Sequence, residues 1–487
     1  MWWRQRSLEA RELSLAGRQA GLFSGVIPQE YAPRPDAEGE GVGGHRFTDG
    51  HHDQRVGPDH ASTSDLVRFF DAEFGTCETT PGRSRYRREP FMSVAVHTPP
   101  ILSPAAGRRI PAARGARENA AGRRTAQEFV IAPVTITPTK PLTPTHIKGL
   151  LWADVLYKAT SVLAPTTLVW NPRMSTLTTQ TTALWNHLDR TEPDADWSGQ
   201  DEAAIGRRYV EFHQARPTID PRELDPYFTR IESDGWIHPA SRRLLELWRA
   251  EFDRLHVRDP GLTDAGPLAW SEQRALAELA DRGLLIDHRV HGGPVYLDGA
   301  RWGVPIRQIV SSDGHANYLV PILRALLPEI APGRLFLLLF DEGISADYLL
   351  LDRVLTAFGA ETTRLALSRV PIDGKVVSSK YGGWTGSTLA DLAAVSGSAD
   401  EHAWRLGMRL YFVGLLDRRC AQSFRIDLLR RCVGRAARLL ALGPSDEKSE
   451  PALPLGPHGY VDPHRLACSL FGPRPAPVPD LLRAVLG

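Results

Sequence analysis

Two segments of this 487-residue sequence combine residue types that bind phosphate groups. The first runs from Lys140 to Lys148 and reads Lys-Pro-Leu-Thr-Pro-Thr-His-Ile-Lys. Thr143 and Thr145 flank a proline and suit the start of a helix, where backbone N–H groups and the helix dipole attract anions. His146 and Lys148 add side-chain donors. The segment predicts a binding site for nucleotide phosphates; the alternative is that His146 only caps the helix and the site is inactive.

The second segment is a loop that spans 373–383 and reads Asp-Gly-Lys-Val-Val-Ser-Ser-Lys-Tyr-Gly-Gly. Lys375 and Lys380 carry charges that neutralise a departing phosphate group, and Ser378 and Ser379 supply hydroxyl groups that cap the loop or donate to phosphates. A mobile loop of this kind closes over a bound ligand. Taken alone it is an ordinary basic turn, but its order and distance after the first segment favour a function.

The first segment resembles the nucleotide signature of class I aminoacyl-tRNA synthetases, and of their arginyl type in particular. That family has Lys-Pro-Leu-His-x-Gly-His in this place, followed by an aspartate eight residues later, which is Asp154 here. Only the second histidine is kept, as His146. Thr143 replaces the first histidine and Thr145 the glycine, and the methyl group of Thr145 would crowd the adenine of a bound nucleotide.

The 373–383 loop is similar to the mobile lysine loop of the same class, which closes over pyrophosphate. The second lysine of the family motif falls on Ser379 in this sequence, although Lys380 is adjacent and Lys375 lies upstream. The whole resemblance covers about 127–410. It implies ATP and Mg²⁺ as ligands, with Mg²⁺ bridging the phosphates.

A third segment, 311–319, is similar to the arginyl-type motif Lys-Ser-Asp-Gly-x-x-x-Tyr-Leu and contributes Asp313 and Tyr318. In the family the tyrosine packs on the substrate side chain, and an aspartate four residues later pairs with its guanidinium group. Ile322 stands in that place. Because an unpaired buried guanidinium would cost several kcal/mol, on the order of a thousandfold in affinity, we do not expect arginine as the substrate. A core tyrosine is the alternative for Tyr318.

The resemblance also assigns a role to Asp341 and Glu342, which follow an apolar run and take the place of a family segment beside the nucleotide. They are expected to hold ribose, Mg²⁺ or an α-amino group. We expect no metal site made of protein side chains alone.

Three functions follow as hypotheses. The first is ATP-dependent activation of an amino acid or similar acid as an acyl-adenylate, followed by ligation that does not involve tRNA, since no anticodon-binding domain is recognisable. The second is a catalytically dead synthetase-like protein that binds a nucleotide, an amino acid or a partner protein. The third is aminoacylation of tRNA, with the basic N-terminal tract as a nucleic-acid arm that binds less tightly as salt rises.

The elements around these segments predict a doubly wound parallel α/β sheet, in which ligands bind across the carboxyl ends of the strands. An apolar, β-branched run at 129–136 is the expected first strand, and a helix follows from about 147 to 163. A helical insertion covers about 185–290, and the second half of the sheet is expected to resume near Val295. The near-continuous apolar run at 335–340 is expected to be a strand buried on both faces.

The ends of the chain differ from this domain, which we assign to 126–400. Residues 1–125 lack sustained periodicity and are expected to be disordered, with Met92 as a possible later start. Residues 401–487 are expected to form a helical region with an irregular, Pro-rich tail from Gly443 to Pro479.

Composition sets limits on location and partners. The 58 basic and 57 acidic residues nearly balance, which gives no global attraction for nucleic acid or anionic membrane. Four cysteines lack the spacing of a zinc site or a disulfide scaffold. No apolar run is long enough to cross a bilayer. We therefore expect a cytoplasmic protein without a membrane partner, and leave its oligomeric state open.

Overall fold

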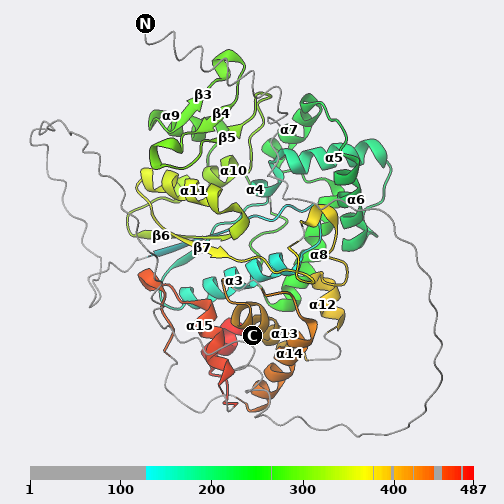
Figure 1. The fold of residues 1–487 in the computed structure, drawn as a ribbon, viewed down its shortest axis with the longest axis vertical. Coiled ribbons are helices and arrows are strands. Elements are labelled where there is room, and N and C mark those ends of the chain that lie inside the picture. Colours follow the sequence, from blue (N-terminus) through cyan, green and yellow to red (C-terminus); the bar gives the residue numbers. More distant parts are fainter. Residues whose placement is uncertain are drawn as a thin grey trace, which may run out of the picture. The chain divides into compact units, whose positions relative to one another are not determined.

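The structure is a computed structural model that describes residues 128–264, 266–376, 378–395, 400–419, 422–443, 452–472 and 475–487 (Figure 1). The N-terminal tract 1–125, with Met92, lies outside these residues, so the expectations for it stay untested. In the described part of the chain, no helix combines the length and apolar character needed to cross a membrane.

A four-stranded parallel sheet forms the centre of the fold, in the order β2-β1-β6-β7. Its strands are β1 (Glu128–Pro133), β2 (Thr166–Leu168), β6 (Arg334–Asp341) and β7 (Glu361–Leu367). The side chains of 335–340 in β6 are at most 2% exposed. A strand covered on both faces must be apolar throughout, which explains the continuous apolar run.

The sheet is wound in two directions, as the sequence predicted. Helix α3 (Pro144–Ser161) connects β1 to β2, and α11 (Ser345–Ala357) connects β6 to β7 on the opposite side of the sheet order. Right-handed crossovers in opposite directions put the two helices on opposite faces, as Figure 1 shows for α3 and α11. The chain reverses direction between β1 and β6, and the carboxyl ends of these strands frame the expected ligand crevice.

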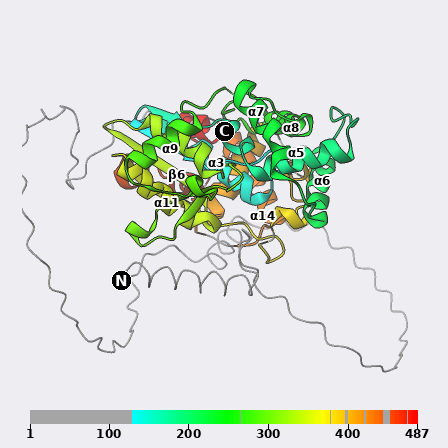
Figure 2. The same cartoon turned by 90° about the horizontal axis from the view of Figure 1, so that it is seen from above.

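The long segment between β2 and β6 begins with helices α4 (Arg173–Thr176), α5 (Thr179–Thr191), α6 (Glu202–Ala215), α7 (Asp225–Asp234), α8 (Pro239–Leu255) and α9 (Glu272–Asp281). Helices α5, α6, α7 and α8 stand to one side of the parallel sheet, and α9 lies apart from them (Figure 1 and Figure 2). Leu184, Tyr209 and Leu244 are among the buried residues that join α5, α6 and α8 into one core.

One expectation for this segment was wrong. Val295 does not return the chain to the parallel sheet, because it lies in a separate antiparallel sheet of β3 (Leu285–Asp287), β4 (Val295–Leu297) and β5 (Arg307–Val310). Helix α10 (Leu319–Leu326) follows, and the parallel sheet resumes only at Arg334. A short apolar run predicts that a strand is present. Which strands pair with it depends on how the whole chain packs.

The C-terminal region is helical and packs beneath α3 in Figure 1. It comprises α12 (Leu389–Val395), α13 (Glu401–Arg409), a π-helical turn (Leu410–Leu415), α14 (Ile426–Ala441), α15 (Pro463–Cys468) and α16 (Asp480–Leu486). Helix α15 interrupts the tail that was expected to be irregular. It begins after Asp462, whose carboxylate accepts from two backbone N–H groups.

A buried ion pair joins α3 to this C-terminal region. Asp154 and Arg409 have side chains 1% and 0% exposed, and their charged atoms are 2.7 Å apart. Asp154 also pairs with Lys158 at 3.1 Å and accepts from the backbone N–H of Arg258 at 3.0 Å. Arg409 donates to the carbonyl of Leu255 at 3.0 Å. The aspartate that the family resemblance placed here therefore holds three parts of the chain together.

Removal of either charge of this pair should destabilise the fold strongly. We expect Arg409→Met and Asp154→Asn each to lower the free energy of unfolding by about 3–5 kcal/mol, because the remaining charge stays buried without its partner. Urea denaturation measures this. The exposed pair of Arg190 and Glu223 provides the control, since Arg190→Met should cost at most about 1 kcal/mol. Equal effects of the buried and exposed changes would contradict the assignment.

Candidate functional site

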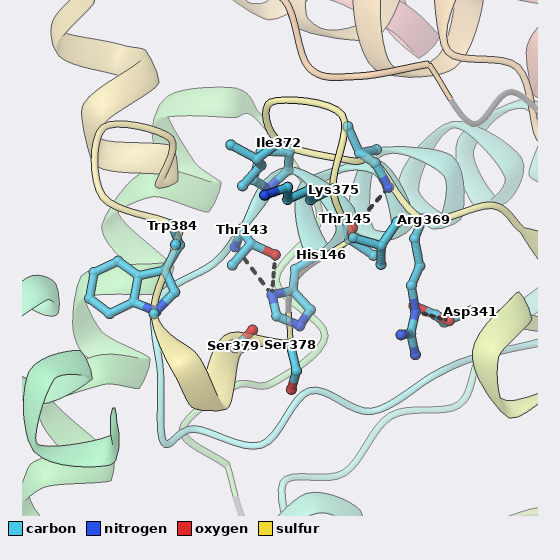
Figure 3. A pocket seen from close by; sticks show the side chains of 15 residues that line it. Thr143, Thr145, His146, Asp341, Arg369, Ile372, Lys375, Ser378, Ser379 and Trp384 are labelled. Carbon is cyan, nitrogen blue, oxygen red and sulfur yellow. Dashed lines mark hydrogen bonds and ion pairs between the residues drawn. The ribbon is translucent and has the colours of Figure 1, made fainter. Parts of the chain in front are cut away.

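A polar cavity of about 140 Å³ lies at the carboxyl ends of β6 and β7, beside the first turn of α3. Three segments line it (Figure 3). Their side chains include Thr143 before α3, Thr145 and His146 in α3, Asp341 at the end of β6, Arg369 after β7, and Ile372, Lys375, Ser378, Ser379 and Trp384 of the following loop. The two phosphate-binding segments predicted from the sequence therefore meet at one cavity.

The first turn of α3 fixes the protonation of His146. The N–H of Thr143, the residue before the helix, donates to Nδ1 of His146 at 3.1 Å. Nδ1 must therefore be an acceptor, and the neutral ring carries its proton on Nε2. Burial, with the charges of Lys140 and Arg369, lowers the pKa of His146 to about 3. The ring is thus a neutral donor at physiological pH.

Thr145 and Lys148 tie α3 to the chain that leaves β7. The hydroxyl oxygen of Thr145 accepts from the N–H of Val370 at 3.0 Å. Lys148 is 1% exposed and donates to the carbonyl of Ser368 at 3.1 Å. Thr145 still borders the cavity, whereas Lys148 does not. The expectation that Lys148 reaches the phosphates is therefore corrected, because its ammonium group binds the carbonyl of Ser368 just after β7.

The carboxylates at the end of β6, Asp341 and Glu342, both accept hydrogen bonds. Nε of Arg369 donates to the two carboxylate oxygens of Asp341 at 2.7 and 2.9 Å, and the N–H of Gly343 adds a bond of 2.7 Å. Glu342 accepts from the hydroxyl of Ser368 at 2.9 Å and does not line the cavity. Among the described residues, no group of three or more potential metal-ligating side chains gathers.

Arg369 is the cavity residue that the sequence reasoning missed. Asp341 holds its Nε, and within the described part of the chain its two terminal NH₂ groups make no hydrogen bond. A Cβ at Gly343 would come within 2.2 Å of Nη2, so glycine is needed there to seat the guanidinium group. The sequence could have indicated Arg369, because a basic residue there follows a strand at the end where ligands bind in such a sheet.

The loop after β7 separates the two predicted lysines. Ile372 and Lys375 exchange two backbone hydrogen bonds around Asp373 and Gly374, whose φ angles of 50° and 77° form a tight hairpin. Lys375 lines the cavity, as do Ser378 and Ser379 farther along the loop. Lys380 does not line it. The expected pair of catalytic lysines is therefore reduced to one at the cavity.

Lys380 lies instead near Lys140. Burial, with the charge of Lys380, lowers the pKa of Lys140 to about 8. The ammonium group of Lys140 donates to the hydroxyl of Thr137 at 2.7 Å and lies 5.4 Å from the ring centre of Tyr209. The two lysines form a second positive region toward α6.

The residues predicted to bind the substrate side chain do not line this cavity. Tyr318 donates its hydroxyl to Asp347, which also pairs with Arg307 at 3.0 Å. Ile322 is 2% exposed and belongs to the core face of α10, while Asp313 is exposed in a turn. The part of the predicted site that was assigned to the substrate side chain is therefore not among the residues that line the polar cavity.

Comparisons with known proteins bear on the fold. No protein-family model and no curated protein matches the sequence. Among solved structures, the chain is similar to the arginyl-tRNA synthetase of Thermus thermophilus, with a TM-score of 0.45 and 16% identity over 63% of this chain and 61% of that one. It is also similar to the arginyl-tRNA synthetase of Plasmodium falciparum, with a TM-score of 0.45 and 10% identity over 65% and 57%. The chain spans about three fifths of the length of these synthetases.

The low pKa of His146 should make the free energy of unfolding depend on pH. An unfolded histidine has an ordinary pKa of about 6.5, so below that pH the unfolded chain takes up a proton that the folded chain does not. The free energy of unfolding should fall as pH drops from about 6.5 toward 3, by up to about 1.4 kcal/mol per pH unit from this residue. Urea denaturation between pH 7 and 5 should show a weaker pH dependence in His146→Gln. The same dependence in both proteins would contradict the assignment.

Proposed function

We propose that the polar cavity binds the phosphates of ATP and that the protein activates a carboxylic acid, other than arginine, as an acyl-adenylate. One observation carries this proposal. The start of α3, the neutral ring of His146, the guanidinium group of Arg369 and the ammonium group of Lys375 converge on one cavity at the carboxyl edge of a parallel sheet. Such an arrangement suits an anionic ligand with several phosphate groups.

The residues suit distinct steps of this reaction. A carboxylate oxygen of the acid attacks the α-phosphorus of ATP, the bond to the bridging oxygen breaks, and pyrophosphate leaves. Nε2–H of His146 and the terminal N–H groups of Arg369 would stabilise charge on the phosphate oxygens, and Lys375 would neutralise the pyrophosphate. We infer that Mg²⁺ arrives with the nucleotide on its phosphate oxygens, since Asp341 already pairs with Arg369.

The size of the cavity bears on how ATP would enter. A volume of about 140 Å³ is small beside the roughly 300–1,000 Å³ of ordinary ligand pockets. We infer that the loop carrying Lys375 and Ser378 moves outward to admit the nucleotide and returns to exclude water. The exposed side chain of Val376 in this loop supports such a movement, because little packing has to be broken.

The acceptor of the acyl group is inferred to be a small amine or another nucleophile rather than tRNA. The near balance of charge supports this choice. Measurable tRNA binding that weakens steeply as salt is raised would instead favour aminoacylation.

A protein that binds a nucleotide without turnover is the second candidate. It is favoured by Thr145, which carries a methyl group where the synthetase signature has glycine and whose hydroxyl already accepts from Val370. The limited volume of the cavity agrees with it. Nucleotide binding without release of pyrophosphate would identify this case.

ATP–pyrophosphate exchange tests the proposal. We expect one acid from a panel of natural and modified amino acids to stimulate exchange. His146→Ala and Arg369→Gln should each lower the rate by about 100- to 1,000-fold, because each removes a donor to the transition state. Arg364→Gln is the matched control: Arg364 lies on β7, the strand that precedes Arg369, is exposed, pairs with Asp352 and does not line the cavity.

Two other outcomes would change the conclusion. Binding of an ATP analogue without exchange for any acid would favour the non-catalytic protein. Exchange that survives both cavity substitutions would show that the phosphates bind elsewhere.

A further inference from the structure

A second cavity, of about 50 Å³, adjoins the first one at the carboxyl ends of β1 and β6. Thr145, His146 and Asp341 border both cavities. The walls of the second cavity are otherwise mostly apolar, and they include Ile136, Leu150, Leu339, Phe340 and Leu367. A polar and an apolar space therefore meet at His146, which suits a ligand with an ionic end and a hydrocarbon end.

Gly149 keeps this apolar cavity open. It lies in the interior of α3, three residues after His146, and therefore faces the same side of the helix. Glycine is unfavourable inside a helix, because it loses more freedom on folding than other residues. A Cβ at this position would meet no atom within 4 Å. The packing of α3 thus gives no reason for glycine, whereas an open cavity does.

The size and chemistry of the cavity limit its occupant. A space of about 50 Å³ accommodates roughly four small groups, at about 10–15 Å³ for each water-sized one. That is enough for a branched aliphatic chain and too little for the purine ring system of adenine. A charged side chain would be buried among Ile136, Leu339 and Phe340 at a high cost in free energy. Asp341, the carboxylate at the edge of the cavity, already pairs with Arg369.

We propose that this cavity holds the side chain of the acid that the protein activates, that this chain is aliphatic with about three or four carbon atoms, and that Gly149 sets its length. The inference rests on the proposed function for the chemistry that follows binding. The carboxylate of the acid would then lie beside His146, at the border with the phosphate cavity. No proton or electron transfer is needed for this binding step.

Substitutions at Gly149 test the proposal. Binding of valine, leucine, isoleucine, phenylalanine, glutamate and arginine would be measured by calorimetry with and without an ATP analogue. We expect an aliphatic member to bind best to the wild-type protein. Gly149→Val should weaken its binding at least tenfold, since one methylene group in an apolar pocket changes affinity about 10- to 200-fold. Gly149→Ala should shift the preference toward a shorter chain.

Gly434→Ala is the matched control. Gly434 lies in the interior of α14, and a Cβ there would first meet a side-chain atom of Arg438 at 3.8 Å. Gly149→Ala and Gly434→Ala should both raise the thermal midpoint, because alanine favours the helix. Only the change at Gly149 should alter which acid binds. This shift in preference separates a pocket residue from a residue that acts on stability alone.

The other outcomes are distinct. Preferred binding of arginine or glutamate, or aliphatic binding unchanged in Gly149→Val, would overturn the assignment. Weaker binding of the ATP analogue in Gly149→Val, with acid binding unaffected, would assign the cavity to the nucleotide. Binding of an aliphatic acid without pyrophosphate exchange would reject adenylation but keep the cavity assignment. No binding of any acid would overturn both.

Discussion

The buried pair of Asp154 and Arg409 is the constraint on which the arrangement of the molecule depends. Two charges without access to water are tolerated only where their geometry is fixed and further hydrogen bonds satisfy them. Here the pair, with Arg258 and the carbonyl of Leu255, fixes α3 against the C-terminal helices and the end of α8. Helix α3 is also the element whose first turn borders both cavities. The ion pair at its middle therefore fixes the position of the site at its start.

The turn before α3 is held from other directions as well. The N–H of Leu142 donates to Glu202 of α6 at 2.8 Å, and burial raises the pKa of Glu202 to about 7. On the opposite side, Thr145 and Lys148 bind the chain that leaves β7. The insertion, the sheet and α3 thus meet at one turn. A site built in this way is preorganised, because its donors do not have to be reoriented when a ligand arrives.

The chemistry of the site depends on two adjoining cavities, one polar and one apolar, that meet at His146. On one side of His146, Arg369 and Lys375 face a polar cavity, and on the other side aliphatic side chains enclose a smaller one. The low pKa of His146 fits this position, because a charged ring that is buried and close to Lys140 and Arg369 would be costly. A neutral donor serves both sides: it binds a phosphate or carboxylate oxygen and adds no charge to the apolar cavity.

The sequence alone determined the features that depend on local order. The apolar runs at 129–131 and 335–340 became parallel strands, and the threonine and proline residues at 143–145 began α3. Tertiary structure decided what lies across the sheet. Lys148 donates a hydrogen bond to the carbonyl of Ser368, 220 residues away in the sequence, and Thr145 accepts one from the N–H of Val370, 225 residues away. Arg369 lines the polar cavity, whereas Tyr318 does not and donates its hydroxyl to Asp347. Helix starts and buried strands can be predicted from neighbouring residues in the sequence. The partner of a polar side chain cannot, because it depends on which distant segments the packed core brings beside it.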